Sequence, residues 1–202
     1  MIVDLGLDVL KTAKTANMNN WGKDSKHNTC YITGHAGSGK STVAFTIKRR
    51  GDIIVNLDRY SQSNNIENTE FDDYLDHEVE GWRKIASATY TGEKGTIKLC
   101  GDEYWSIVER FSKALENYSM DKYDEGNRVI VEGIQIADNW LYSCSSYYID
   151  KPIIILTTDI DVSLQRVIAR DKLRSEDMNK YLGWYMDTET RLNNLIRVTS
   201  AT

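Results

Sequence analysis

The amino-acid sequence predicts an α/β protein in which a parallel sheet carries helices on both faces, giving a three-layer α/β/α fold. Three observations support this prediction. Short apolar runs recur along the 202-residue chain, amphipathic segments separate them, and a glycine-rich stretch joins the first run to the first helix. Hydrophobic residues make up 41% and charged residues 27%, a balance typical of a globular domain with a sizeable core.

Four apolar runs are the expected strands of the sheet. They lie at residues 28–33, 52–57, 128–133 and 152–157. The last three are rich in Ile and Val, which is typical of parallel strands buried on both faces. The single proline, Pro152, opens the fourth run, where a missing N–H does least harm.

Amphipathic segments between and after these runs predict the helices, because their apolar residues recur at intervals of three and four. The expected helices span 41–50, 71–88, 102–118, 161–174 and 178–197. Together with the strands they form one domain at 28–202, with a helical substrate-binding insertion at about 60–125.

A polar arm, residues 1–27, precedes this domain. Within it, Val3 to Leu10 has the spacing of a short helix. We expect the arm to pack on the domain edge with Trp21 as its anchor, although a linker from a larger polypeptide is an open alternative.

Composition restricts the classes of partner. The net charge of −5 argues against a general nucleic-acid-binding surface. Three widely spaced cysteines, Cys30, Cys100 and Cys144, indicate neither a disulfide framework nor a zinc site, so a reducing, cytoplasmic compartment is expected. No apolar run approaches the roughly 18 residues of a membrane span, so no membrane partner is expected. Mg²⁺ brought by a nucleotide is the only metal predicted, and the oligomeric state stays open.

The most informative stretch is Gly-His-Ala-Gly-Ser-Gly-Lys-Ser-Thr at 34–42, which matches the phosphate-binding pattern G-x-x-x-x-G-K-[ST]. Backbone N–H groups approach a phosphate closely where Cβ atoms are missing, which explains the glycines. The following helix adds the positive end of its dipole. Lys40 supplies a charge for the outer phosphates, and the Ser41 hydroxyl is placed for Mg²⁺. A turn without a ligand would not need Lys-Ser after the last glycine. The expected nucleotide-binding residues are Gly34, His35, Ala36, Gly37, Ser38, Gly39, Lys40, Ser41 and Thr42.

Two carboxylates follow expected strands, and ligands of open α/β sheets bind at the carboxyl ends of strands. Asp58 is predicted to accept the proton of an acceptor hydroxyl, or to orient it, with a turn cap as the alternative. Glu132 is predicted to hold Mg²⁺ or its water and to help bind substrate, with an ordinary strand-end carboxylate as the alternative. Gly133 allows a ligand or backbone to come close.

Arginines at helical spacing predict a lid at about 161–176. Arg166, Arg170 and Arg174 share one helix face, where guanidinium groups could stabilise the charge of a transferring phosphoryl group. A solvated basic face is the alternative. Further residues are candidates for binding an anionic acceptor, or for stacking on a base unless they pack in the core: Arg59, Arg83, Lys84, Tyr74, Trp82 and Trp105.

Taken together, these residues resemble the P-loop kinases of small molecules, a group that includes nucleoside and nucleotide kinases, uridine-kinase-like proteins and zeta-toxin-like kinases. The resemblance covers about 28–197. It rests on the glycine-rich loop, on Leu57-Asp58-Arg59-Tyr60, on 129–133, and on Arg166 and Arg170.

This resemblance implies a parallel five-stranded sheet of order 2-3-1-4-5 and ATP with Mg²⁺ as cofactors. It implies transfer of the γ-phosphoryl group to a hydroxyl or phosphate of a nucleoside, nucleotide or nucleotide sugar. Lys40, Asp58, Arg166 and Arg170 would be the catalytic residues.

Other functions of a phosphate-binding loop stay open: an NTP-hydrolysing switch or ATPase, a polynucleotide 5′-kinase, or a binding module without catalysis. The N-K-x-D motif of GTPases is missing, and the third strand ends in Glu-Gly rather than the Asp-Glu common in motor ATPases. Because no base-recognition signature of a monophosphate kinase is found, the acceptor is not predicted.

Overall fold

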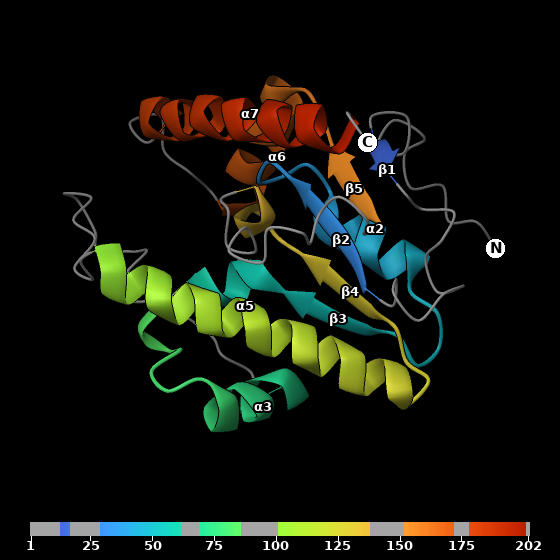
Figure 1. Cartoon of the computed structure of the whole chain (residues 1–202). Helices are drawn as coiled ribbons and strands as arrows, with labels where there is room; N and C mark the ends of the chain where they lie inside the picture. The colour runs from blue at the N-terminus through green and yellow to red at the C-terminus, as the bar shows by residue number, and fades with distance from the viewer. Residues whose placement is uncertain are drawn as a thin grey trace.

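The computed structural model describes residues 13–16, 29–61, 69–85, 101–137, 152–171 and 178–200. Five strands form one sheet in the order β1-β5-β2-β4-β3 (Figure 1). Their bounds are β1 Ala13–Ala16, β2 Thr29–Gly34, β3 Ile53–Asn56, β4 Val129–Glu132 and β5 Ile153–Leu156.

Four strands are parallel, and the order β3-β4-β2-β5 confirms the first four positions of the predicted order. The prediction of a fifth parallel strand is wrong. The edge position is taken by β1, which comes from the N-terminal arm and runs antiparallel to β5. Ala13 pairs with Leu156 and Ala16 with Ile153. The arm therefore does meet the domain edge, while its expected helix at 3–10 and the anchor Trp21 lie outside the described residues.

Successive strand residues point to opposite sides of the sheet, so apolar side chains stand on both faces. Helices cover each of these two faces. Cys30, Ile32 and Ile130 pack with Val43 and Ala44 of α2 (Lys40–Ile47) on one face.

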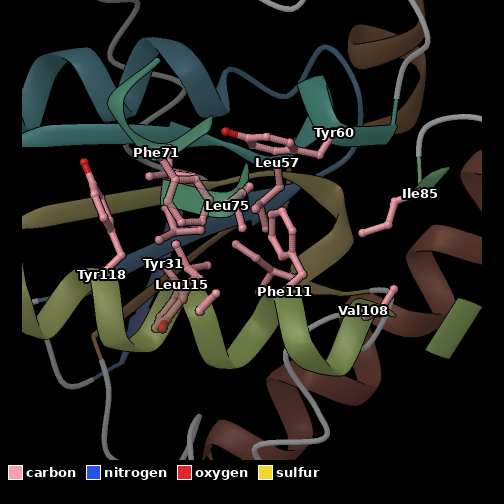
Figure 2. Packing of buried hydrophobic residues seen from close by; sticks show 14 of the residues in the cluster. Tyr31, Leu57, Tyr60, Phe71, Leu75, Ile85, Val108, Phe111, Leu115 and Tyr118 are labelled. Carbon is pink, nitrogen blue, oxygen red and sulfur yellow. The ribbon is translucent and has the colours of Figure 1, made fainter. Parts of the chain in front are cut away.

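The opposite face packs against α3 (Glu70–Glu78), α5 (Gly101–Asp124) and the end of α7 (Met178–Ser200), and Figure 1 shows α5 running alongside β3 and β4. Figure 2 shows Tyr31 of β2 among Phe71, Leu75, Phe111 and Leu115 in this larger cluster. The described part of the predicted insertion at 60–125 therefore builds the main core.

The helix predicted at 71–88 is shorter than expected, since α3 ends at Glu78. A capping box between Thr69 and Asp72 fixes its start. Val79 leaves the helical region with φ −132°, and Gly81 has the left-handed φ of 77°, so the chain turns there.

The other helices begin within one residue of the predicted starts: α2 ends at Ile47, three residues before the predicted end, and α5 continues to Asp124. Helix α6 is described as Ile160–Asp171, and the predicted residues 172–174 lie outside the described residues. Two short 3₁₀ helices follow strands: η2 (Leu57–Ser61) after β3 and η3 (Ile134–Ile136) after β4. Within the described residues, no helix is both long and apolar enough to cross a membrane.

Candidate functional site

The glycine-rich loop connects the carboxyl end of β2 to the start of α2, at the centre of the sheet. Two of its glycines, Gly34 and Gly37, are required by close contacts. A Cβ on Gly34 would lie 2.8 Å from the backbone oxygen of Leu156. A Cβ on Gly37, where φ is 77°, would overlap the backbone oxygen of Ser163 in α6. Gly39 caps α2 in the left-handed conformation with φ 97°.

The N-terminus of α2 has the properties of an anion-binding end. Gly39 offers no side-chain cap, and the first turn carries no acidic residue. The first N–H groups of a helix have no partner within the helix and sit at the positive end of its dipole. An anion placed there would satisfy both requirements.

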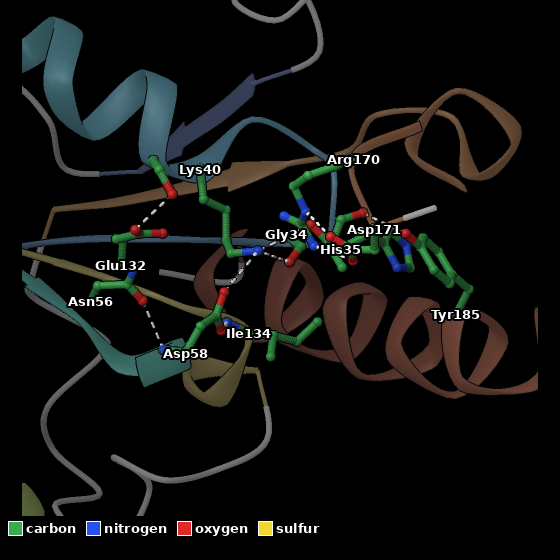
Figure 3. Close-up of polar contacts among 12 residues, drawn as sticks. Gly34, His35, Lys40, Asn56, Asp58, Glu132, Ile134, Arg170, Asp171 and Tyr185 are labelled. Carbon is green, nitrogen blue, oxygen red and sulfur yellow. Dashed lines mark hydrogen bonds and ion pairs between the residues drawn. The ribbon is translucent and has the colours of Figure 1, made fainter. Parts of the chain in front are cut away.

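Lys40 brings a positive charge to the inner side of the loop, where its side chain is only 5% exposed. Its Nζ donates to the backbone oxygens of Gly34 at 3.2 Å and His35 at 3.1 Å. The same Nζ lies 3.7 Å from Oδ2 of Asp58 (Figure 3). The loop therefore closes around an ammonium group that faces a carboxylate from the next strand end.

Ser41 and Glu132 meet because β2 and β4 are neighbours in the sheet. The Ser41 hydroxyl donates to Oε1 of Glu132 at 2.8 Å. Glu132 is 1% exposed, and burial raises its pKa above the ordinary value, while the Ser41 hydrogen bond acts in the opposite direction. Its buried Oε2 has no hydrogen-bond partner among the described residues.

This pair fits a magnesium ion that a nucleotide would bring. A hydroxyl and a carboxylate are hard oxygen ligands, and Mg²⁺ in phosphoryl-transfer sites takes one or two such ligands together with phosphates and water. The orphaned Oε2 of Glu132 supplies a buried acceptor for the ion or its water. No cluster of three or more His, Cys, Asp or Glu side chains suited to a metal occurs among the described residues.

Asp58 lies in η2, immediately after β3, and its position is fixed by backbone contacts. Its own N–H donates to the Asn56 side chain at 2.9 Å, and its Oδ1 accepts the N–H of Ile134 at 3.2 Å. Gly133 makes this approach possible, since a Cβ there would lie 2.7 Å from Cβ of Leu57. Asp58 keeps a 30% exposed side chain, so it is both fixed and accessible.

The two described arginines of the predicted lid lie on α6, beside the loop. Arg166 donates to the backbone oxygen of Gly37 at 3.2 Å. Arg170 is 65% exposed and donates to both carboxylate oxygens of Asp171, at 2.6 and 2.8 Å. The Asp171 hydrogen bonds raise the pKa of Arg170, and the charge of Asp58 adds to this rise. Arg174 lies outside the described residues.

Both candidate acceptor-binding arginines pair with carboxylates of α3. Arg59 reaches Oδ2 of the fully buried Asp72 at 3.4 Å. Arg83 is ion-paired with Asp76 and stacks over Trp82, 4.4 Å from the ring centroid. Trp82 is 3% exposed and therefore packs in the core, which was the alternative to stacking on a base.

Two residues that contact the loop were not predicted from the sequence as site residues. Tyr185 and Glu189 lie one turn apart on α7, and both contact residues of the loop. Tyr185 was visible in the sequence only as one apolar position of an amphipathic helix. Glu189 resembles any half-exposed helix carboxylate, and nothing in its neighbours along the chain points to His35.

Searches of this chain against models of protein families and against curated proteins gave no match. The function is therefore argued from the geometry. Lys40, Ser41, Asp58 and Glu132 converge on one edge of the sheet, as the pattern predicted, whereas Arg59 and Arg83 are engaged on α3.

Proposed function

We propose that this protein is an ATP-dependent phosphotransferase of the P-loop kinase type, which moves the γ-phosphoryl group of Mg·ATP to a hydroxyl or phosphate of a small molecule. The observation that carries the proposal is the convergence at the loop. A buried Lys40 ammonium lies 3.7 Å from Asp58, and the adjacent Ser41 hydroxyl is bonded to the buried Glu132.

The donor's phosphates would bind on the N–H groups of the loop and of the first turn of α2. Lys40 would exchange the backbone oxygens of Gly34 and His35 for phosphate oxygens, an exchange that replaces neutral acceptors by charged ones. Mg²⁺, held through Ser41 and the Glu132 carboxylate or its water, would neutralise charge on the outer phosphates.

Asp58 would act on the acceptor. Its Oδ1 accepts the N–H of Ile134, and this hydrogen bond holds the carboxylate close to Lys40 of the loop. A carboxylate in that position can orient an attacking hydroxyl and take its proton, and general-base catalysis contributes typically about 10²–10⁴ in rate. Asp58 after β3 and Lys40 after β2 would thus place acceptor and donor in line.

Arg170 would complete the charge stabilisation from the lid side. Its pairing with the adjacent, half-exposed Asp171 is a surface ion pair, and such pairs contribute little stability. A phosphoryl group with more negative charge would therefore compete with Asp171 for the guanidinium. The acceptor we favour is a nucleoside, nucleotide or nucleotide sugar, the class that the resemblance implies.

A pooled acceptor screen with γ-labelled ATP tests this function. Purified protein is incubated with Mg·ATP and sets of nucleosides, nucleotides and nucleotide sugars, and labelled products are separated from phosphate. We expect label in at least one acceptor, and a kcat lower by about 10²–10⁴ for Asp58→Asn at little change in ATP affinity.

The exposed Asp124 of α5 provides the matched control, and Asp124→Asn should transfer at the wild-type rate. If phosphate is released rapidly and no acceptor is labelled, the protein is an ATPase and the kinase proposal is wrong. A normal rate in Asp58→Asn would remove Asp58 from its assigned role.

A further inference from the structure

The loop is held from outside by side chains that come from the C-terminal third of the chain. Five consecutive backbone oxygens, from Gly34 to Ser38, accept hydrogen bonds from side chains. Lys40 takes the first two. The other three are bound by Tyr185 to Ala36 at 2.6 Å, Arg166 to Gly37 at 3.2 Å and Thr158 to Ser38 at 3.2 Å.

Helix α7 makes the most extensive of these contacts. Tyr185 is fully buried, and its ring stacks on the His35 imidazole with centroids 5.1 Å apart and planes inclined by 14°. Glu189, one turn later, places Oε2 2.5 Å from Nε2 of His35, which is itself 1% exposed (Figure 3 shows His35 beside Tyr185). Leu164 and Val167 of α6 join Tyr185 and Ala36 in one apolar cluster.

These contacts fix the direction in which the loop presents its donors. A trans peptide unit is planar, so its N–H points away from its C=O. Bonding the oxygens of Ala36, Gly37 and Ser38 to side chains on the outside orients the N–H groups of the same three units toward the inside, where the Ser38 N–H meets the His35 oxygen at 3.1 Å. Burial raises the pKa of Tyr185 to about 12, so its hydroxyl remains a donor at neutral pH.

We infer that Tyr185 and Glu189 are positioning residues for the nucleotide: α7 docks on His35 and Ala36 and holds the loop in the conformation that accepts phosphate. This inference rests on the proposed nucleotide binding. When only a fraction of molecules has the competent loop, the apparent dissociation constant rises in inverse proportion to that fraction. Preorganisation by α7 keeps the fraction high without any contact between α7 and the reacting atoms.

Two conservative variants test the inference. Tyr185→Phe keeps the ring on His35 but removes the hydroxyl from Ala36, and Glu189→Gln keeps the shape but removes the charge. Calorimetric titration with Mg²⁺ and a non-hydrolysable ATP analogue should give dissociation constants raised about two- to tenfold for each, from the ordinary range for one hydrogen bond. The exposed Asp187, on the same helix, is the matched control, and Asp187→Asn should bind as wild type does.

A reciprocal measurement separates positioning from a general loss of stability. If α7 favours the binding-competent loop, ligand must favour docked α7 to the same extent. Amide hydrogen exchange of 178–200 should slow when the analogue binds wild type, and slow less in Tyr185→Phe.

The outcomes distinguish the two proposals. A wild-type protein that does not bind the analogue contradicts the proposed function. A wild type that binds, with both variants binding equally well and α7 exchange indifferent to ligand, overturns the positioning role alone.

Discussion

The two sides of the glycine-rich loop differ in how firmly they hold their charges. On the strand side, Lys40 is 5% and Glu132 1% exposed, and each is bonded to the loop or to the first turn of α2. On the side of α6, Arg170 is 65% exposed. Buried, hydrogen-bonded charges have one arrangement, whereas exposed side chains change rotamers on the nanosecond scale or faster.

This difference assigns different tasks to the two sides. The strand side is built before any ligand arrives and would set the position of the donor and metal. The helix side carries an arginine that can leave Asp171 for a ligand. Substitution of the buried Lys40 should therefore affect binding and chemistry together, while substitution of Arg170 should affect chemistry with little effect on folding.

Apart from Asp58→Asn, the largest effect is expected for Lys40→Met. Loss of the ammonium should lower phosphoryl transfer by about 10²–10³ or more, the range for removing one preorganised group that stabilises transition-state charge. It should also weaken binding of the ATP analogue. Steady-state transfer and calorimetry measure the two effects. Lys48→Met, at an exposed lysine just after the end of α2, is the control. A comparable loss of transfer rate in Lys48→Met would contradict the specific role of Lys40 in stabilising the transferring phosphoryl group.

The next largest effect is expected for Arg170→Ala. We expect kcat to fall by about 10–10², below the range for dedicated arginine fingers because the residue is shared with Asp171. The melting temperature should stay within a degree or two, since an exposed pair contributes little. The control is Arg83→Ala, which removes another arginine paired to an aspartate and half exposed, but on the α3 side. Equal losses of kcat in both variants would contradict the separate role of α6.

Gly37→Ala tests how tightly the loop is packed against α6. Its left-handed φ of 77° and the overlap with the backbone of Ser163 should together cost about 1–3 kcal/mol of unfolding free energy, in the range of backbone strain at special positions. Gly126→Ala separates the two causes, because Gly126 has a φ of 84° with nothing within 4 Å of an added Cβ. Denaturant unfolding should show the larger loss at Gly37, and equal losses would mean that α6 does not press on the loop.

The smallest effect concerns the buried Glu132 carboxyl. Its pKa is raised from 4.5, so the folded state holds the proton more tightly than the unfolded state, and the ionised form costs stability. That cost is absent well below pH 4.5 and complete above the folded pKa. Glu132→Gln should therefore gain stability relative to wild type as the pH rises through this window. Thermal unfolding without ligand, from acid to neutral pH, measures this gain in stability. Glu109→Gln, at an exposed position, is the control. A stability difference between Glu132→Gln and wild type that does not change with pH would contradict the prediction.

Much of the strand side could be predicted from the sequence because its signals are local. Apolar runs marked four parallel strands, and parallel neighbours bring their carboxyl ends to one edge, so the meeting of Lys40, Ser41, Asp58 and Glu132 followed from strand order. Spacing alone also placed Arg166 and Arg170 on one helix.

The rest depends on contacts between distant segments. Ala-Lys-Thr-Ala at 13–16 has no strand pattern of its own and becomes β1 because β5 offers an open edge. The contacts of His35 with Tyr185 and Glu189 span about 150 residues, and helical spacing cannot tell which face of α7 meets the loop. The end of α3 at Glu78 was missed because the apolar periodicity in the sequence continues past Gly81, where the chain turns.

A crystal structure with Mg²⁺ and a non-hydrolysable ATP analogue tests the central claim most directly. The account predicts triphosphate oxygens on the N–H groups of the loop, Lys40 transferred from the Gly34 and His35 oxygens to the outer phosphates, and Mg²⁺ on the Ser41 hydroxyl. A saturated protein in which Lys40 still bonds those backbone oxygens, with the nucleotide bound elsewhere or not at all, would contradict it.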